Sequence, residues 1–248
     1  AAAALLPLGA EEAPSALQLE RSYLEALDAA TARGARDAPP FELVIPAARF
    51  APSSPCAAGL ATGVAGRDGE VLAWELEGSW LEYAFSVPAT GLYEIALEYC
   101  QLPGKRGPIQ REILIDGSHP FREAKSLSLP RLWADAGPPR KDNQGNDVRP
   151  RQVEVPAWRV QPLEHPEGLA RTPLRFLLTA GEHRVRLGAV KEPVALASVR
   201  VSAPPPVPSY AEAKAGWATR GYAAATGAAV TVQAERAMLK SDPTVRME

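Results

Sequence analysis

Two stretches in the middle of the chain alternate between apolar and polar residues with a period of two. The first has apolar residues at Leu81, Tyr83, Phe85 and Val87, and the second at Tyr93, Ile95, Leu97 and Tyr99. Such alternation is typical of strands that turn one face to a core. The residues between them, 88–91, contain proline and glycine and predict a turn. We therefore expect two successive strands whose apolar faces meet in one core.

Short runs of the same kind continue from Phe41 to Val201. They predict strands at 42–45, 71–76, 81–87, 92–101, 109–116, 126–132, 152–159, 173–178, 183–189 and 195–201. The 25 prolines and 19 glycines fall between these runs, where turns are needed. The fold class expected is all-β, an antiparallel β-sandwich of the jelly-roll type.

Two tight turns are predicted within this region. Residues 174–190 read as a hairpin with Ala180 and Gly181 in its turn, so that Val185 and Leu187 face inward. Asp116 and Gly117, at the end of another predicted strand, form the second turn.

The rest of the chain divides into flanking segments. We interpret 1–10 as a signal-peptide remnant, with a disordered start of a cytosolic fragment as the alternative. Segment 11–40 is read as a helix and linker, with the amphipathic helix starting at Ser15, ending at Gly34 and burying Leu17, Leu24 and Leu27. The sandwich then occupies 41–203.

Segment 204–248 is expected to hold a proline-rich linker, a short helix and the start of a truncated second domain. The helix is predicted at 210–222 with Gly221 at its C-terminal end. A single strand is predicted at 229–237, and it either opens that second domain or folds back onto the sandwich.

The net charge, the short apolar run at the start and the cysteine spacing argue against nucleic-acid binding, a membrane span and a cysteine metal site. The formal net charge is -2 and no basic stripe carries interleaved aromatic residues, so we expect no nucleic-acid partner. The apolar run at the start is too short to span a bilayer, so no membrane span is expected. Cys56 and Cys100 either form one disulfide or are two buried thiols, and their spacing is not that of a metal site.

Several long segments resemble a known family. They are GSWLEYAFSVPATGLYEIALEY (78–99), REILIDGSHPFREA (111–124), LPRLWAD (129–135), KDNQGNDVRPRQVEVPAW (141–158) and, further on, LLTAGEHRVRL, PSYAEAKAGWATRGY and VQAERAMLKSDPT. Over roughly 41–244 the chain is similar to the N-terminal region of bacterial extracellular solute-binding proteins of carbohydrate ABC transporters. In that family a sandwich like the carbohydrate-binding modules of the galactose-binding-like superfamily precedes the receptor.

This resemblance implies an extracellular or cell-surface protein that binds a glycan or oligosaccharide. It also implies the transport receptor domain and the permease of the same system as partners. In the wider superfamily the first strand carries acids that hold a structural calcium. Here Pro46 and Ala48 stand in their place, so no cofactor and no metal are expected.

Sugar recognition needs aromatic faces and planar polar groups. The polar segment 134–151 is bracketed by two tryptophans and offers such groups. The candidate ligand-binding residues are Arg131, Trp133, Asp135, Asp142, Asn146, Arg149, Gln152 and Trp158. The alternative is structural: both tryptophans pack in the protein, and 142–147 is a hairpin turn in which Gly145 takes a positive φ.

Catalysis has little support in the sequence. The acids Asp135, Asp142, Glu154 and Glu164 would have to oppose each other in a cleft, and the three histidines have no metal-ligand spacing. We therefore expect a non-catalytic, carbohydrate-binding-like module of a sugar-uptake receptor. The alternatives are a structural or protein-interaction sandwich without a glycan ligand, and an accessory module of a polysaccharide-degrading enzyme.

Overall fold

The computed structural model describes residues 20–51, 59–223, 227 and 231. The chain divides into two compact units, Ala1–Pro204 and Pro205–Glu248, which are described separately. The predicted signal-peptide remnant (1–10) and Cys56 lie outside the described residues, as does all of the predicted strand 229–237 except Thr231. The two alternatives for Cys56 and Cys100, a disulfide or two buried thiols, and the second domain therefore stay predictions.

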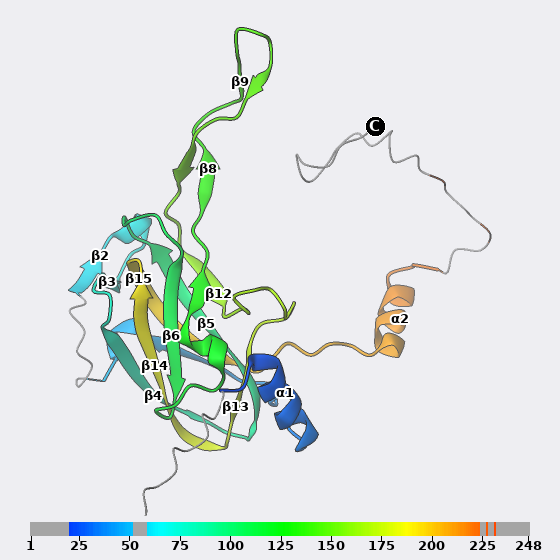
Figure 1. Ribbon diagram of the computed structural model, residues 1–248. Helices are drawn as coiled ribbons and strands as arrows, with labels where there is room; N and C mark the ends of the chain where they lie inside the picture. Colours follow the sequence, from blue (N-terminus) through cyan, green and yellow to red (C-terminus); the bar gives the residue numbers. More distant parts are fainter. Residues whose placement is uncertain (1–19, 52–58, 224–226, 228–230, 232–248) are drawn as a thin grey trace, which may run out of the picture. The chain divides into compact units, whose positions relative to one another are not determined.

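The first unit contains two antiparallel sheets that face each other (Figure 1). The seven-stranded sheet holds β1 (Glu42–Pro46), β2 (Gly59–Thr62), β3 (Glu70–Trp74), β5 (Gly91–Gln101), β12 (Arg159–Pro162), β13 (Arg175–Leu178) and β15 (Val194–Ser202). The four-stranded sheet has the order β4-β14-β6-β7, with β4 (Trp80–Val87), β6 (Ile109–Ile115), β7 (Leu127–Leu129) and β14 (Gly181–Lys191).

The chain passes repeatedly from one sheet to the other. β3 and β5 belong to the larger sheet, while β4 between them and β6 after them belong to the smaller one. The same alternation returns at β13, β14 and β15. Successive strands that alternate between two facing sheets are the jelly-roll arrangement. The expected all-β antiparallel sandwich is confirmed.

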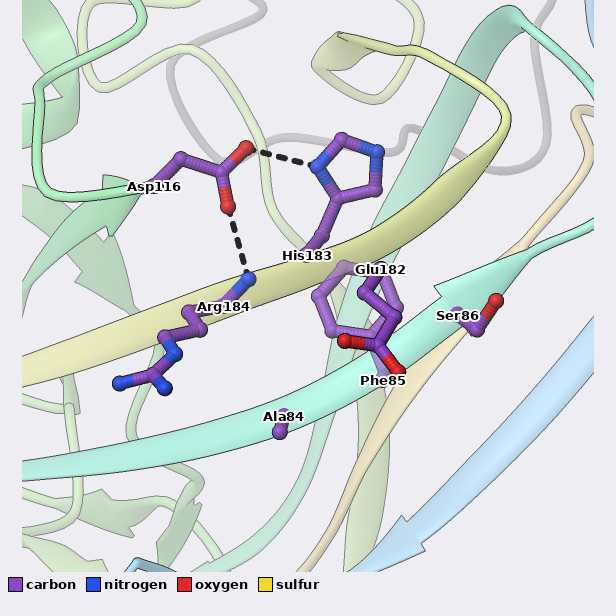
Figure 2. A pocket seen from close by; sticks show the side chains of 7 residues that line it. All are labelled: Ala84, Phe85, Ser86, Asp116, Glu182, His183 and Arg184. Carbon is purple, nitrogen blue, oxygen red and sulfur yellow. Dashed lines mark hydrogen bonds and ion pairs between the residues drawn. The ribbon is translucent and has the colours of Figure 1, made fainter.

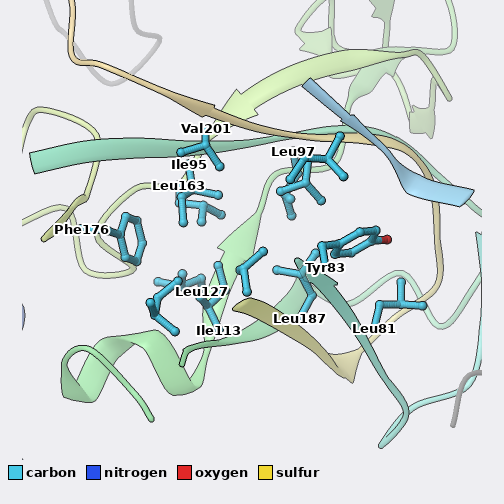
Figure 3. Packing of buried hydrophobic residues seen from close by; sticks show 14 of the residues in the cluster. Leu81, Tyr83, Ile95, Leu97, Ile113, Leu127, Leu163, Phe176, Leu187 and Val201 are labelled. Carbon is cyan, nitrogen blue, oxygen red and sulfur yellow. The ribbon is translucent and has the colours of Figure 1, made fainter. Parts of the chain in front are cut away.

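The core lies between the two sheets (Figure 3). Leu81 and Tyr83 of β4 face Ile95 and Leu97 of β5, and all four are buried. The alternation in the sequence therefore identified the buried faces correctly. Each fully buried leucine or isoleucine side chain contributes about 1.5–3 kcal/mol, so this one pair of strands supplies a substantial part of the stability.

The predicted hairpin 174–190 is wrong. β13 pairs with β5 in the larger sheet, whereas β14 pairs with β4 and β6 in the smaller one. Ala180 and Gly181 thus carry the chain across the sandwich, and the backbone N–H of Ala180 donates to the Thr90 hydroxyl at 2.9 Å. Val185 and Leu187 are buried as expected, because side-chain alternation does not depend on the pairing partner.

One other predicted strand, 152–159, divides into two. Gln152–Glu154 form β11, and the chain reaches β12 only at Arg159. Pro156 lies between them and has no N–H to donate to a neighbouring strand.

Helix α1 (Tyr23–Ala32) packs on one end of the core. It starts at Tyr23 rather than at Ser15, because Ser22 and Glu25 form a capping box. Leu24 is exposed, contrary to the predicted stripe, and Tyr23 is buried against Phe121 with ring centroids 5.0 Å apart. The predicted helix end at Gly34 agrees with the structure within two residues. Leu17 lies outside the described residues.

Short elements complete the fold. In the described ranges, 3-10 turns span Ala47–Arg49, Val64–Gly66 and Arg122–Lys125. In the second unit, α2 (Tyr210–Thr219) is capped by Ser209 and followed by Gly221 with a φ of 80°, which confirms the predicted short helix. Within the part of the chain that the structure describes, neither helix has the length and apolar character needed to cross a bilayer.

Candidate functional site

The polar segment between Arg131 and Trp158 is a long two-stranded arm that projects from the sandwich (Figure 1). Near its base β8 (Trp133–Asp135) pairs with β11 (Gln152–Glu154), and near its tip β9 (Arg140–Lys141) pairs with β10 (Asp147–Val148). The arm leaves the sandwich after β7, whose Leu129 pairs with Ile109 at the start of β6. The sequence predicts β11 as part of the strand at 152–159 and offers a hairpin turn at 142–147 as the alternative, but it does not predict β8, β9 or β10.

One face of the arm gathers an aromatic ring and polar groups. In the register of β8 and β11, Trp133 pairs with Glu154 and Asp135 pairs with Gln152. Residues directly opposite each other, and residues two apart on one strand, share a face of an antiparallel pair. These four residues therefore form one surface, which we call the arm face. Trp133 is 42% exposed on it.

The polar part of the arm face is ordered. Gln152 Nε2 donates a hydrogen bond to Asp135 Oδ1, so the amide and the carboxylate are held together one residue pair beyond Trp133. An exposed indole beside planar donors and acceptors matches the two demands of a sugar, since the ring C–H groups stack and the hydroxyls form hydrogen bonds.

Arg131 is not available to a ligand, contrary to expectation. Its side chain is only 3% exposed, and Nη2 lies 2.5 Å from Glu192 Oε2 while Nη1 lies 3.3 Å from Glu154 Oε2. Its Nε also donates to the carbonyl of Gly107 at 2.9 Å. The guanidinium is used inside the protein, where it ties the base of the arm to the turn between β14 and β15.

The backbone at Leu132 adds a second connection at the base of the arm. Gln101, the last residue of β5, accepts from the Leu132 N–H at 2.6 Å and donates to the Leu132 carbonyl at 3.1 Å. The start of β8 is thus bound to the larger sheet through both backbone groups of one residue. The arm face therefore stands on a fixed base.

The tip of the arm is a turn. Asp142 Oδ1 accepts from the backbone N–H groups of Gln144 and Asn146, each at 2.8 Å, and Oδ2 accepts from Asn146 Nδ2 at 3.0 Å. Gly145 has a φ of 85°. Hydrogen bonds from Asn146 and Gln144 lower the pKa of Asp142 below its usual value. Asp142 and Asn146 therefore build the turn, as the structural alternative held, and Arg149 lies exposed between β10 and β11.

Trp158 is also a packing residue and not part of the arm face. Its indole Nε1 donates to the Val64 carbonyl at 2.8 Å, and the Arg67 guanidinium lies 4.8 Å from its ring centroid. The ring packs against a small cluster that contains Val71 and Cys100. Its role is to fix the chain between the arm and β12.

The four acids considered for catalysis are divided among three places. Asp135 and Glu154 lie on the arm face, Asp142 is in the tip, and Glu164 accepts from Gln161 Nε2 at 3.0 Å after β12. Among the described residues, no group of three or more histidine, cysteine, aspartate or glutamate side chains is placed to hold a metal ion. Pro46 ends β1 and Ala48 lies in the 3-10 turn that follows.

A recess of about 640 Å³ lies at the other end of the four-stranded sheet (Figure 2). Asp116, in the turn after β6, contacts His183 Nδ1 at 2.7 Å through Oδ2 and accepts from the Arg184 N–H at 2.8 Å through Oδ1. His183 Nε2 lies 2.7 Å from the Thr179 carbonyl. The Asp116 and His183 side chains thus bind each other and the protein backbone, although Asp116 is exposed.

Sequence reasoning predicted the turn at Asp116 but missed this use of the carboxylate. The backbones of Ile115 and Ser118 exchange hydrogen bonds of 2.9 and 3.0 Å around Asp116 and Gly117, which confirms the tight turn. The partner, His183, is 67 residues away in sequence, so no local pattern connects the two. Among the described residues that line this recess, the only tyrosine, tryptophan or phenylalanine ring is that of Phe85, which is buried, whereas Trp133 on the arm face is exposed.

No protein-family model matches the chain, and no curated protein matches it. Among solved structures, it is similar to the C-terminal CBM6 of a laminarinase from Zobellia galactanivorans, with 14% identity, a TM-score of 0.40, and coverage of 65% of this chain and 99% of that one. A family 35 carbohydrate-binding module from Clostridium thermocellum gives 14% identity, a TM-score of 0.38, and coverage of 65% and 97%.

A larger protein is similar over only part of its length. A Podospora anserina GH26-CBM35 β-(1,4)-mannanase gives 12% identity and a TM-score of 0.39, with 67% of this chain and 28% of the mannanase covered. At these identities and TM-scores the comparisons do not place the chain in a family.

Proposed function

We propose that the sandwich is a non-catalytic carbohydrate-binding-like module that holds a glycan on the arm face. The observation that carries this proposal is the exposed Trp133 beside the ordered pair of Asp135 and Gln152. The apolar face of a sugar ring stacks on the indole, and its hydroxyls reach the carboxylate and the amide. A single shallow site of this kind binds weakly, since little surface is buried against the cost of immobilising the ligand.

The setting of the module is an extracellular or cell-surface solute-binding protein for sugar uptake. The sequence resemblance over 41–244 supports this setting, and it implies a receptor domain and a permease as partners. The coding sequence beyond Glu248 tests it. A two-lobed receptor is expected there, and a polysaccharide hydrolase would make the module an enzyme accessory instead.

A second candidate function is protein docking through the arm. Val153 and Val155 are exposed, and so is Val148 nearer the tip. Val153 alternates with Gln152 and Glu154 and therefore lies on the reverse face of the arm. If the module binds a protein and no glycan, we assign protein binding to this apolar reverse face.

Titration calorimetry or affinity electrophoresis with a panel of plant and bacterial polysaccharides tests the first function. Trp133→Ala should weaken binding by at least about tenfold, because it removes the stacking surface. The matched control is Trp217→Ala, which removes a similarly exposed tryptophan from the second unit. A chain that binds no glycan, or a Trp133→Ala variant that binds like the parent, would refute the proposal.

A further inference from the structure

Glu154 has an unusual position on the arm face. It pairs directly with Trp133, and Cβ atoms of directly opposed residues lie about 4.5–5.5 Å apart. Its side chain is 15% exposed. A ring stacked on Trp133 would therefore have its edge beside this carboxylate.

The two oxygens of Glu154 are not equivalent. Oε2 accepts from Arg131 Nη1 at 3.3 Å, and Arg131 is itself held by Glu192 and by the Gly107 carbonyl. Oε1 is buried and accepts no hydrogen bond from any described residue. A buried acceptor without a donor is costly, and native structures contain few of them. The fixed Oε2 also sets the direction of the unsatisfied Oε1.

Arg106 approaches this oxygen without forming a hydrogen bond to it. Arg106 Nε lies 3.9 Å from Oε1, which is beyond hydrogen-bond distance, and its side chain is 63% exposed. Arg106 belongs to the loop between β5 and β6 and has a φ of 66° between Gly104 and Gly107. An exposed side chain on such a loop can turn aside when a better donor arrives.

From this geometry we infer that Glu154 is the specificity-determining residue of the arm face. Its Oε1 accepts a hydrogen bond from a hydroxyl of the sugar ring stacked on Trp133. This inference rests on the proposed glycan-binding function and extends it to the class of ligand.

The charges around Trp133 select an uncharged sugar. The arm face itself carries two carboxylates, of Asp135 and Glu154, and no cationic side chain, while Arg131 at its base pairs with Glu154 and Glu192. Arg151 precedes Gln152 and alternates to the reverse face. A uronate would bring a further carboxylate to a face that already holds two, whereas a neutral hexose offers a hydroxyl donor to Oε1 without that charge.

The test compares neutral and acidic polysaccharides on the same variants. The parent should bind a neutral glycan, such as a mannan or a galactan, in preference to polygalacturonate. Glu154→Gln replaces one carboxylate oxygen by an NH2 group. Because Arg131 donates to the Oε2 position, the amide oxygen should face Arg131 and the NH2 should take the place of Oε1, where it cannot accept from a hydroxyl. Binding of the neutral glycan should therefore fall by at least about tenfold. Circular dichroism and the melting temperature check that the variant is folded.

Glu192→Gln is the matched control. Glu192 also pairs with Arg131 but lies off the arm face, so this variant disturbs Arg131 without removing a group proposed to contact the ligand. It should lose clearly less affinity than Glu154→Gln does, and equal losses in both variants would show that Glu154 acts only through Arg131. Binding that needs Trp133 but not Glu154, or a preference for polygalacturonate, would overturn the inference and leave the proposed function standing. A parent that binds no glycan would overturn the proposed function itself.

Discussion

Protonation of His183 should stabilise the sandwich in a pH-dependent way. Both ring nitrogens lie 2.7 Å from an oxygen, Nδ1 from Asp116 Oδ2 and Nε2 from the Thr179 carbonyl. A neutral imidazole has only one N–H, so both contacts are hydrogen bonds only when the ring is a cation. Asp116 follows β6 of the smaller sheet and Thr179 follows β13 of the larger one. The charged ring therefore joins the two sheets.

The direction of the pH dependence follows from two pKa shifts. Burial opposes the charged form of His183, but the hydrogen bonds to Thr179 and Asp116 outweigh it and raise the pKa. Burial likewise acts against ionised Asp116, and the N–H of Arg184 together with His183 lowers its pKa. Glu182 and Arg184, which flank His183 in β14, also line the recess, and Arg184 pairs with Glu82.

These shifts define a window of pH. The His183 contribution is fully present below the unfolded-state pKa of about 6.5 and is lost as the pH rises through the higher folded-state value. The Asp116 contribution is present above about pH 3.9 and is lost as the pH falls through its lower folded-state value. The combined stabilisation should be complete between about pH 4 and 6.5.

The magnitude comes from the two hydrogen bonds. A hydrogen bond to a charged group is worth about 1.5–3 kcal/mol when buried. The Asp116 side chain is 49% exposed, so its pairing with His183 is screened and counts for about 0–1 kcal/mol. His183→Gln should thus lower the free energy of unfolding by about 2 kcal/mol at pH 5.5, or the melting temperature by about 4–8 °C.

Thermal unfolding of the parent and of His183→Gln between pH 4.5 and 9 measures this difference. We expect the gap between the two melting temperatures to narrow above pH 7, because a neutral ring donates only one of the two hydrogen bonds. Arg184→Gln, next to His183 but exposed, is the control and should change little. A gap of constant size over the whole pH range would refute the assignment of a cation.

Three further predictions concern packing and metal. The buried Arg111 guanidinium lies 4.7 Å from the Trp74 ring centroid and donates to the carbonyls of Gln110, Lys191 and Glu192. Arg111→Ala should therefore lower the free energy of unfolding, measured by urea denaturation, by about 3–5 kcal/mol. A decrease of less than about 1 kcal/mol would contradict this structural role. A Cβ added at Gly91 would lie 2.7 Å from Ala38 Cα, so Gly91→Ala should lower the free energy of unfolding by about 1–3 kcal/mol. Gly137 has open space around it, and the control Gly137→Ala should have no measurable effect. A chelator should leave the melting temperature unchanged, because Pro46 and Ala48 stand where calcium ligands would be, and a clear drop would show that a metal is bound.

The parts of the fold that depend on neighbouring residues could be predicted from the sequence. Leu81 and Tyr83 are buried because strand alternation fixes the side-chain direction locally. The turn at Asp142 and Gly145 follows from turn chemistry within five residues. The start of α1 also depends on neighbouring residues, because the capping box of Ser22 and Glu25 lies within four residues.

The parts that depend on distant residues could not be predicted. The sequence of β13 and β14 is typical of a hairpin, yet β13 pairs with β5 in the larger sheet and β14 pairs with β4 in the smaller one. Trp158 and Trp133 are both tryptophans beside a polar segment, and only the bond from Trp158 to Val64, 94 residues away, shows that one packs while the other is exposed. The sequence likewise indicates Arg131 as a ligand-binding residue, because its ion-pair partner Glu192 is remote in sequence and the pairing is visible only in the structure.

Arg131 does not lie on the arm face, but with Gln101 it holds the base on which the proposed site stands. A weak ligand loses affinity whenever its site must be ordered on binding. Arg131 and Gln101 hold the base of the arm, and Glu192 fits so closely that a Cβ on Gly104 would lie 2.4 Å from its Oε2. The backbone that carries Trp133, and the carboxylate of Glu154, are therefore held in place before a ligand of the proposed kind binds. Loosening this base should weaken glycan binding even though none of its residues contacts the ligand.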